Sequence, residues 1–170
     1  MAVNTTAGAR FYIGPVTNTD TLNALDDAAA LEFFEDIVEG DWDEIEEVES
    51  LGDLGDSSEV ATFASLRDSR TRKFKTTRDA GTMAVVVGVD ELDDGQIAMV
   101  AAEKTKFNYA FKVVYADTRG EGYSPTTDYF AGMVLSRQKN IGDVQAITKR
   151  TFNVAVNSAV YTDATDPTGS

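Results

Sequence analysis

Alternation of apolar and polar residues predicts β-structure over most of the chain, and one stretch organises the rest. Two alternating runs, 60–66 and 83–89, flank a polar segment, which predicts a long β-hairpin over residues 57–89. Both faces of each run carry apolar residues, so both runs are expected to be covered strands of the sheet. The intervening segment is polar on both faces except at Phe74. It therefore predicts either a loop or an arm that docks outside its own domain.

Further segments show the same period. Strands are predicted at 10–13, 42–51, 107–116, 128–136 and 144–157. The first is expected to stop at Gly14 and Pro15. In the last, Ile147 and Phe152 fall on opposite parity, which predicts a β-bulge near Lys149 and Arg150.

Two segments have a helical period instead. Apolar residues recur every three to four positions over 22–38, which predicts an amphipathic helix or turn with Thr21 as candidate cap and Gly40 as stop. The firmest helix spans 96–104, where Asp93 or Asp94 can cap the N-terminus and complement the helix dipole.

These elements predict a mainly β fold: an antiparallel β-sandwich or partly closed barrel with one packed α-helix and a long β-hairpin arm. We expect one domain over residues 10–157, because 170 residues suffice for a single core. The small, polar residues 1–9 predict a flexible N-terminus, and residues 158–170 predict a flexible C-terminal tail.

The amino-acid composition excludes several kinds of catalytic and metal site. Cysteine and histidine are both absent, which excludes disulfides, thiolate zinc sites, cysteine nucleophiles and Ser-His triads. No segment has the layout of a signal peptide or the length of a membrane span, so we expect a soluble protein without membrane insertion. We predict no cofactor.

Charge is unevenly distributed in a chain of net charge −14. Between Arg10 and Arg67 there is no lysine or arginine, whereas acidic residues are dense. The basic residues of the arm then follow within a short span. Such asymmetry fits intramolecular pairing or a solvated face. It fits equally the basic arm of one subunit meeting the acidic surface of the next, which would fix register.

The acidic clusters give no specific catalytic or metal site. An EF-hand loop starting at Asp90 would place Leu92 and Ala101 where ligands are needed, so a turn and helix cap is the better interpretation. A looser calcium site near Asp41 or Asp53 and a pair of hydrolytic carboxylates lack any distinguishing pattern. Phosphate-binding glycine loops are absent, and one aromatic residue in the arm does not make a stacking platform for nucleic acid.

Several blocks, in this order, resemble the tail tube proteins of long, non-contractile-tailed bacteriophages. They are FYIGP, the W-x-x-I-x-x-V-x-x-LG-x-x-G segment at 42–55, VATFASLRDSRTRKFK, the D-x-G at 79–81, DDGQ-x-A from residue 93, FKVVYAD and YFAGMVLSRQKNIGDV. The resemblance covers about residues 10–157. The acidic segment 24–39 looks like an insertion relative to this family.

The resemblance implies a structural virion protein of the phage tail, made in the host bacterial cytoplasm. Homohexameric rings would stack into a hollow tube, with strands of six subunits closing an inner barrel and the helix at 96–104 outside. Genome DNA would pass through an acidic lumen, and tail tip and tail terminator proteins would be further partners. The hairpin arm would contact the neighbouring ring through Arg67, Arg70, Arg72, Lys73, Phe74, Lys75 and Arg78.

Two other functions stay open on the residues alone. One is a monomeric acidic β-sandwich binding module, assisted by calcium. The other, weaker, is an enzyme that uses carboxylates. The tube subunit is the preferred hypothesis, since it explains an arm without a place in its own core and predicts no catalytic, cofactor or metal site.

Overall fold

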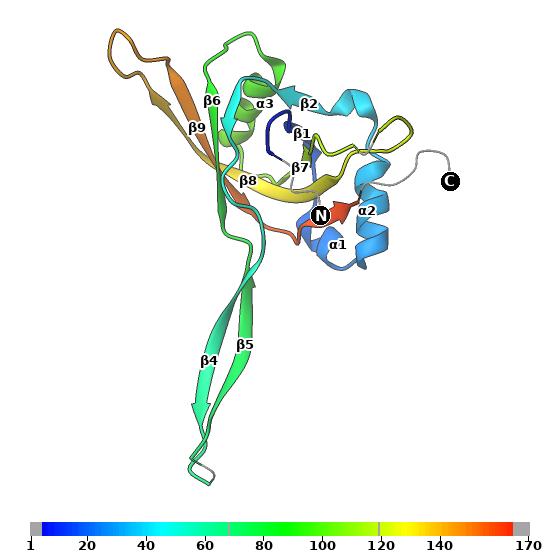
Figure 1. Cartoon of the computed structure of the whole chain (residues 1–170), viewed down its shortest axis with the longest axis vertical. Coiled ribbons are helices and arrows are strands. Elements are labelled where there is room, and N and C mark those ends of the chain that lie inside the picture. The colour runs from blue at the N-terminus through cyan, green and yellow to red at the C-terminus, as the bar shows by residue number, and fades with distance from the viewer. Residues whose placement is uncertain (1–4, 68, 119, 165–170) are drawn as a thin grey trace.

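One antiparallel sheet contains most strands of the computed structural model, which describes residues 5–67, 69–118 and 120–164 (Figure 1). Along the sheet the strands are ordered β2 (Asp43–Ile45), β1 (Arg10–Val16), β7 (Tyr109–Val114), β8 (Thr127–Asn140), β9 (Lys149–Val156), β6 (Thr82–Gly88) and β3 (Val48–Ser50). Strand β10 (Tyr161–Asp163) pairs with the start of β8. The predicted mainly β, antiparallel class is confirmed.

The sheet curls so that its two edges approach each other at one end. Edge strands β2 and β3 are joined only by Glu46 and Glu47, and three peptide units reach at most about 11 Å. Helix α3 (Asp94–Glu103) packs across this end. Its Asp93 cap accepts the Glu46 N–H at 3.0 Å, and the buried Gln96 amide donates to the Gly88 carbonyl at 2.8 Å. The result is one curled sheet that is not closed into a barrel, since β2 and β3 do not pair among the described strands.

The interior of the curled sheet is the main core. Phe11, Phe111 and Phe130 are fully buried, from the neighbouring strands β1, β7 and β8. The Phe11 and Phe111 rings stack with centroids 5.6 Å apart, and those of Phe111 and Phe130 stack at 5.3 Å. In the alternating pattern that predicted these strands, every second side chain thus points into the core.

Two short helices replace the single helix or turn predicted over 22–38. Asn18 caps α1 (Thr19–Asn23) and Asp26 caps α2 (Asp27–Glu35), so Thr21 lies inside α1 and Gly40 lies beyond α2. The second Asx cap restarts the helix, because its carboxylate accepts the Ala29 N–H. Together the helices cover the outer face of β7, β8 and β10.

Burial explains why this acidic segment stays on the sheet. Phe34 is 1% exposed and stacks on Tyr129 at 5.4 Å. Lys112 is also buried, with its Nζ 4.7 Å from the Trp42 ring centroid and 3.5 Å from Glu39. A cation on an aromatic ring beside a carboxylate is a satisfied buried charge. The segment that resembled an insertion is thus part of a second apolar cluster, formed by Leu22, Ala30, Phe34, Trp42, Ala110, Ala131 and Tyr161.

Other boundaries differ from the sequence predictions. The single strand expected over 42–51 is two strands, because Glu47 has a φ of 55° and turns the chain from one edge of the sheet to the other. Strand β1 continues through Gly14 and Pro15 with a register shift. Strand β8 extends to Asn140, and the register shift of the β8–β9 pair lies at Leu135 rather than near Lys149.

The chain ends are described in part. Residues 1–4 and 165–170, within the two predicted flexible ends, lie outside the described residues. Within the predicted C-terminal tail, Tyr161 is buried and Tyr161–Asp163 form β10. The described part of that tail therefore belongs to the folded domain.

Candidate assembly interface

A long two-stranded hairpin projects from the body of the molecule (Figure 1). It consists of β4 (Ser57–Ala64) and β5 (Thr71–Asp79), which pair only with each other. The run 60–66 was predicted to be a covered strand of the main sheet. That prediction is wrong, since the run pairs with β5 outside the core, and only the run 83–89 enters the main sheet, as β6.

The register divides the arm into two faces. Residues directly opposite each other in an antiparallel pair share a face. Phe63 lies opposite Arg72 and Ala61 lies opposite Phe74, so one face combines aromatic rings with guanidinium groups. The opposite face pairs Val60 with Lys75 and Thr62 with Lys73.

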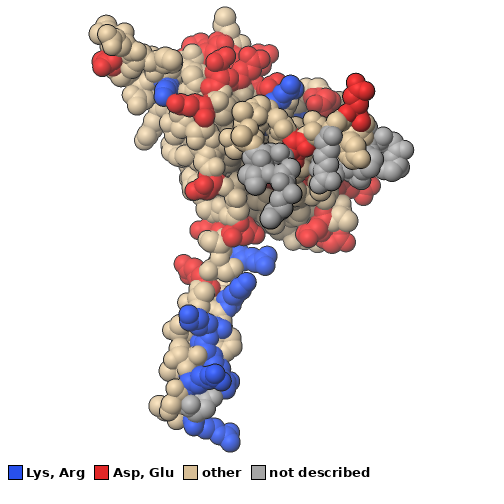
Figure 2. All heavy atoms as spheres, in the orientation of Figure 1, with Lys and Arg blue, Asp and Glu red and all other residues tan. Residues whose placement is uncertain are grey.

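All the predicted site residues lie on this hairpin, and all are exposed. Figure 2 shows that Lys and Arg gather along the arm, whereas Asp and Glu are scattered over the body. The six bases at Arg67, Arg70, Arg72, Lys73, Lys75 and Arg78 are more than a third of the chain's fifteen. The molecule is therefore polarised, with a basic projection on an acidic body.

Exposed apolar side chains on the arm add a second signal, and of these only Phe74 was predicted from the sequence to lie at the contact. Val60, Phe63 and Phe74 are 53–60% exposed, and Leu66 at the tip is fully exposed. An isolated two-stranded hairpin is marginally stable in water. Clustered exposed apolar residues mark interaction surfaces. The exposed apolar side chains therefore mark the arm as a candidate interaction surface.

A second projection is the turn between β8 and β9, which also escaped the sequence reading. Ile141, Val144 and Ile147 are 68–105% exposed. In Figure 1 this turn and the arm point away from the body in different directions. At the base of the turn between β8 and β9, Glu91 forms ion pairs with Lys139 at 3.1 Å and with the buried Arg150 at 2.8 Å. These contacts, first the hydrogen bond from Lys139, lower the pKa of Glu91.

Part of the sheet edge is open. Strand β7 pairs with β8 only as far as Gly132. Beyond it, residues 133–140 of β8 pair with β9 alone among the described strands. Exposed strand edges carry unpaired N–H and C=O groups and are templates for another strand.

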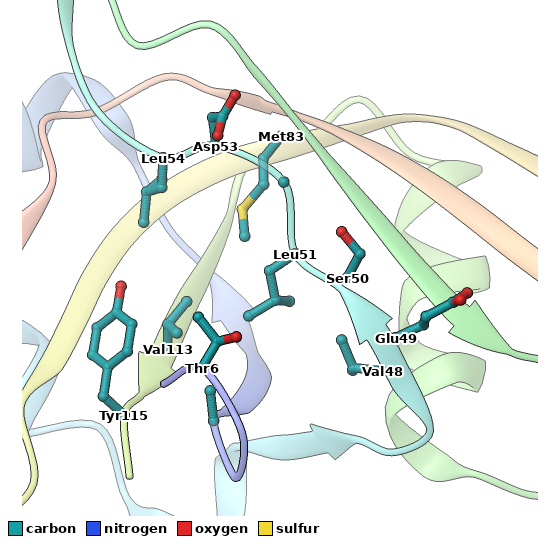
Figure 3. Close-up of a pocket in the computed structure, with 12 residues that line it drawn as sticks. Thr6, Val48, Glu49, Ser50, Leu51, Asp53, Leu54, Met83, Val113 and Tyr115 are labelled. Carbon is teal, nitrogen blue, oxygen red and sulfur yellow. The ribbon is translucent and has the colours of Figure 1, made fainter. Parts of the chain in front are cut away.

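A hollow lies at the mouth of the curled sheet, where β7 faces the segment after β3 (Figure 3). It has a volume of about 530 Å³ and is lined by Leu51, Leu54, Met83 and Val113, with Tyr115 at its side. Burial and a 2.6 Å hydrogen bond to Asp128 raise the pKa of Tyr115. We therefore interpret the hydrogen bond from the neutral Tyr115 hydroxyl to Asp128 as a structural contact.

No group of three or more His, Cys, Asp or Glu side chains suited to a metal occurs among the described residues. The acids around Asp90 instead cap α3 and its preceding turn. Among the described helices, none is long and apolar enough to cross a membrane.

No family model matches the sequence, and no curated protein matches it. Solved structures do match the fold. The anti-feeding prophage (AFP) baseplate has a chain with a TM-score of 0.65 at 10% identity, covering 96% of this chain and 98% of that one. The SPP1 tail tube matches with a TM-score of 0.61 at 13% identity, covering 92% and 76%. The sheath/tube terminator of the PVC extracellular contractile injection system matches at 0.66 and 9%, covering 96% and 99%.

The chain thus has the fold of tail tube and related injection-system proteins, which confirms at the level of fold the resemblance read from its residues. The structures that share this fold come from a baseplate, a tail tube and a sheath/tube terminator.

Proposed function

We propose that this protein is the structural subunit of a bacteriophage tail tube, in which homohexameric rings stack into a hollow cylinder. The observation that carries the proposal is the β4–β5 arm, a basic and partly apolar hairpin with no place in its own core. The shared fold with the SPP1 tail tube supports it. A chain that folds with an uncovered arm is built to be covered by another copy.

The basic arm and the acidic body that it would contact are different parts of the subunit surface. The arm supplies positive charge, and the body has the excess of carboxylates that gives the chain its net charge of −14. A contact between two different patches is heterologous, and it propagates unless rotation closes it. Lateral contacts would close the ring, and the arm would join one ring to the next through Arg67, Arg70, Arg72, Lys73, Phe74, Lys75 and Arg78.

The cargo, the further partners and the location of the protein would follow from its place in a tail tube. Genome DNA would be cargo, and tail tip and terminator proteins would bind the two ends. Assembly would follow synthesis in the host cytoplasm, and the tube would belong to the virion of a long, non-contractile-tailed phage. The fold alone is compatible also with contractile systems, since the PVC terminator shares it.

Electron microscopy of the purified protein, combined with sedimentation over a range of concentrations, tests the proposal. We expect stacked rings or tubes with sixfold symmetry in end views, and a pelletable fraction that rises above a threshold concentration. A chain that stays monomeric at high concentration, alone and with preformed tail tips as initiators, would refute it.

A further inference from the structure

One broad face of the main sheet carries almost no charge. It is the side of β6, β9 and β8 that points away from the core, formed by residues 82, 84, 86 and 88, residues 149, 151, 153 and 155, and residues 133, 136, 138 and 140. We call it the uncharged sheet face. Its central rows are Ala84–Asn153–Ser136 and Val86–Thr151–Gln138.

The composition of this face departs from that of the whole chain. Apart from Lys149, its side chains are apolar or neutral and polar, and none of its residues is buried. Lys149 is its one charged member, and Glu49 neutralises it at 2.8 Å. Asn153 donates to Ser136 at 2.8 Å, so part of its polarity is satisfied within the face. In a chain with 26% charged residues, a solvent-facing sheet would be expected to carry several charges.

The rest of the sheet surface is occupied. The other side of β6 and β9 forms the main core with α3, through Val85, Phe152 and Met99. On the same side as the uncharged sheet face, the surface near the start of β8 is covered by α1 and α2. Among the described residues, the uncharged sheet face is the broad sheet surface that no helix covers.

Edges on either side of this face allow it to continue into neighbouring copies. On one side, β8 is open from residue 133 to residue 140. On the other, β3 is an edge strand of three residues. Copies placed side by side would extend the sheet into a cylinder. If the face pointed outward, the main core and α3 of every subunit would have to fit inside that cylinder. If it points inward, the main core and α3 lie outside.

We propose that the uncharged sheet face is the wall of the channel, so that the passing DNA meets neutral side chains rather than a ring of carboxylates. This inference rests on the proposed tube. It departs from the acidic lumen implied by the family resemblance. Duplex DNA carries a negative charge every ~1.7 Å of its axis, so a basic wall would hold it and an acidic wall would oppose its entry. A neutral wall does neither.

Thiol accessibility tests the assignment, because the chain contains no cysteine and one substitution creates a unique thiol. Thr151→Cys places it in the centre of the face. Assembled tubes are treated either with a small maleimide dye or with a maleimide coupled to a large folded protein. Labelling is compared with that of the same sample after denaturation.

We expect the small reagent to label Thr151→Cys in tubes and the protein-coupled reagent to lose its labelling, since only the former enters the channel. Ala101→Cys, exposed on α3 on the other side of the sheet, is the matched control and should react with both. Gln138→Cys gives a second readout on the same face if Thr151→Cys does not assemble.

Labelling of both face variants by the two reagents would put the face on the outside, and labelling by neither would put it between subunits. Either result overturns the inference and leaves the tube itself intact. Failure of the unmodified chain to form tubes would instead refute the proposed function, and this inference with it.

Discussion

Reversing the charge of one face of the arm should abolish tube assembly without unfolding the subunit. Lys73 and Lys75 lie side by side on that face, opposite Thr62 and Val60, and both are exposed. The variant Lys73→Glu/Lys75→Glu makes the chain more acidic by four units of charge. Because the arm lies outside the core, the free energy of unfolding should change by no more than about 0.5 kcal/mol.

The cost for assembly is larger. Each exposed ion pair contributes roughly 0.2–1 kcal/mol, and a reversed charge both removes an attraction and adds a repulsion of similar size. Two reversals then cost about 2 kcal/mol per arm contact, which raises the threshold concentration about thirtyfold at 1.4 kcal/mol per tenfold change. Salt should weaken assembly of the unmodified protein, since the Debye length is only about 10 Å at 0.1 M.

The assay compares the pelletable fraction across protein concentrations, with urea unfolding followed by circular dichroism. Lys73→Arg/Lys75→Arg keeps the charge and should assemble normally. Lys104→Glu/Lys106→Glu makes the same change in net charge on the exposed surface of the body, and should also assemble. Normal tubes from the arm variant, or an equal defect in the body variant, would show that the arm's charge does not form the contact.

Three further predictions concern the subunit and are measured as free energies of urea unfolding. Gly95→Ala should destabilise by about 1–3 kcal/mol, because its Cβ would overlap the β2 backbone, whereas Gly40→Ala meets open space and should be near neutral. Phe111→Ala should cost about 3–5 kcal/mol, since the ring is fully buried in the aromatic stack, and the half-exposed Phe107→Ala far less; equal losses would contradict the core described above. Glu91→Gln should be less stable than the unmodified protein at neutral pH. A carboxylate whose pKa is lowered on folding stabilises above its unfolded pKa and loses this effect as the pH falls through the folded one. The difference should therefore vanish in acid, and a difference that persisted there would refute the ion-pair account.

The pattern of residues predicted the class of the fold and the position of the arm. Helix α3 and strands β7 and β8 were recognised because their periods are regular and their faces distinct. The arm's bases were correctly placed on one hairpin, because a run of polar residues cannot enter a core.

What the sequence could not reveal has a physical reason in each case. Val60 and Phe63 alternate as a core strand does, because a face covered by another copy needs the same side chains as a face covered by its own. Glu47 at positive φ splits one predicted strand in two, and a residue other than glycine gives no sign of this in sequence. The buried Lys112 depends on Trp42 and Glu39, which reach it only in the folded chain.

The short connection between β2 and β3 has a consequence for folding kinetics. Glu46 and Glu47 connect β2 and β3, which lie at opposite edges of the sheet and have three residues each. Because the connection is so short, we expect the two strands not to pair with β1 and β6 independently of each other. Pairing β2 with β1 joins segments some thirty residues apart, and pairing β3 with β6 joins segments nearly forty apart. We expect both loop closures to come before the last step, in which α3 packs against the connection between β2 and β3. We expect this end of the sheet to form late and cooperatively, and the arm, which hangs from β3 and β6, to be aligned only once it has.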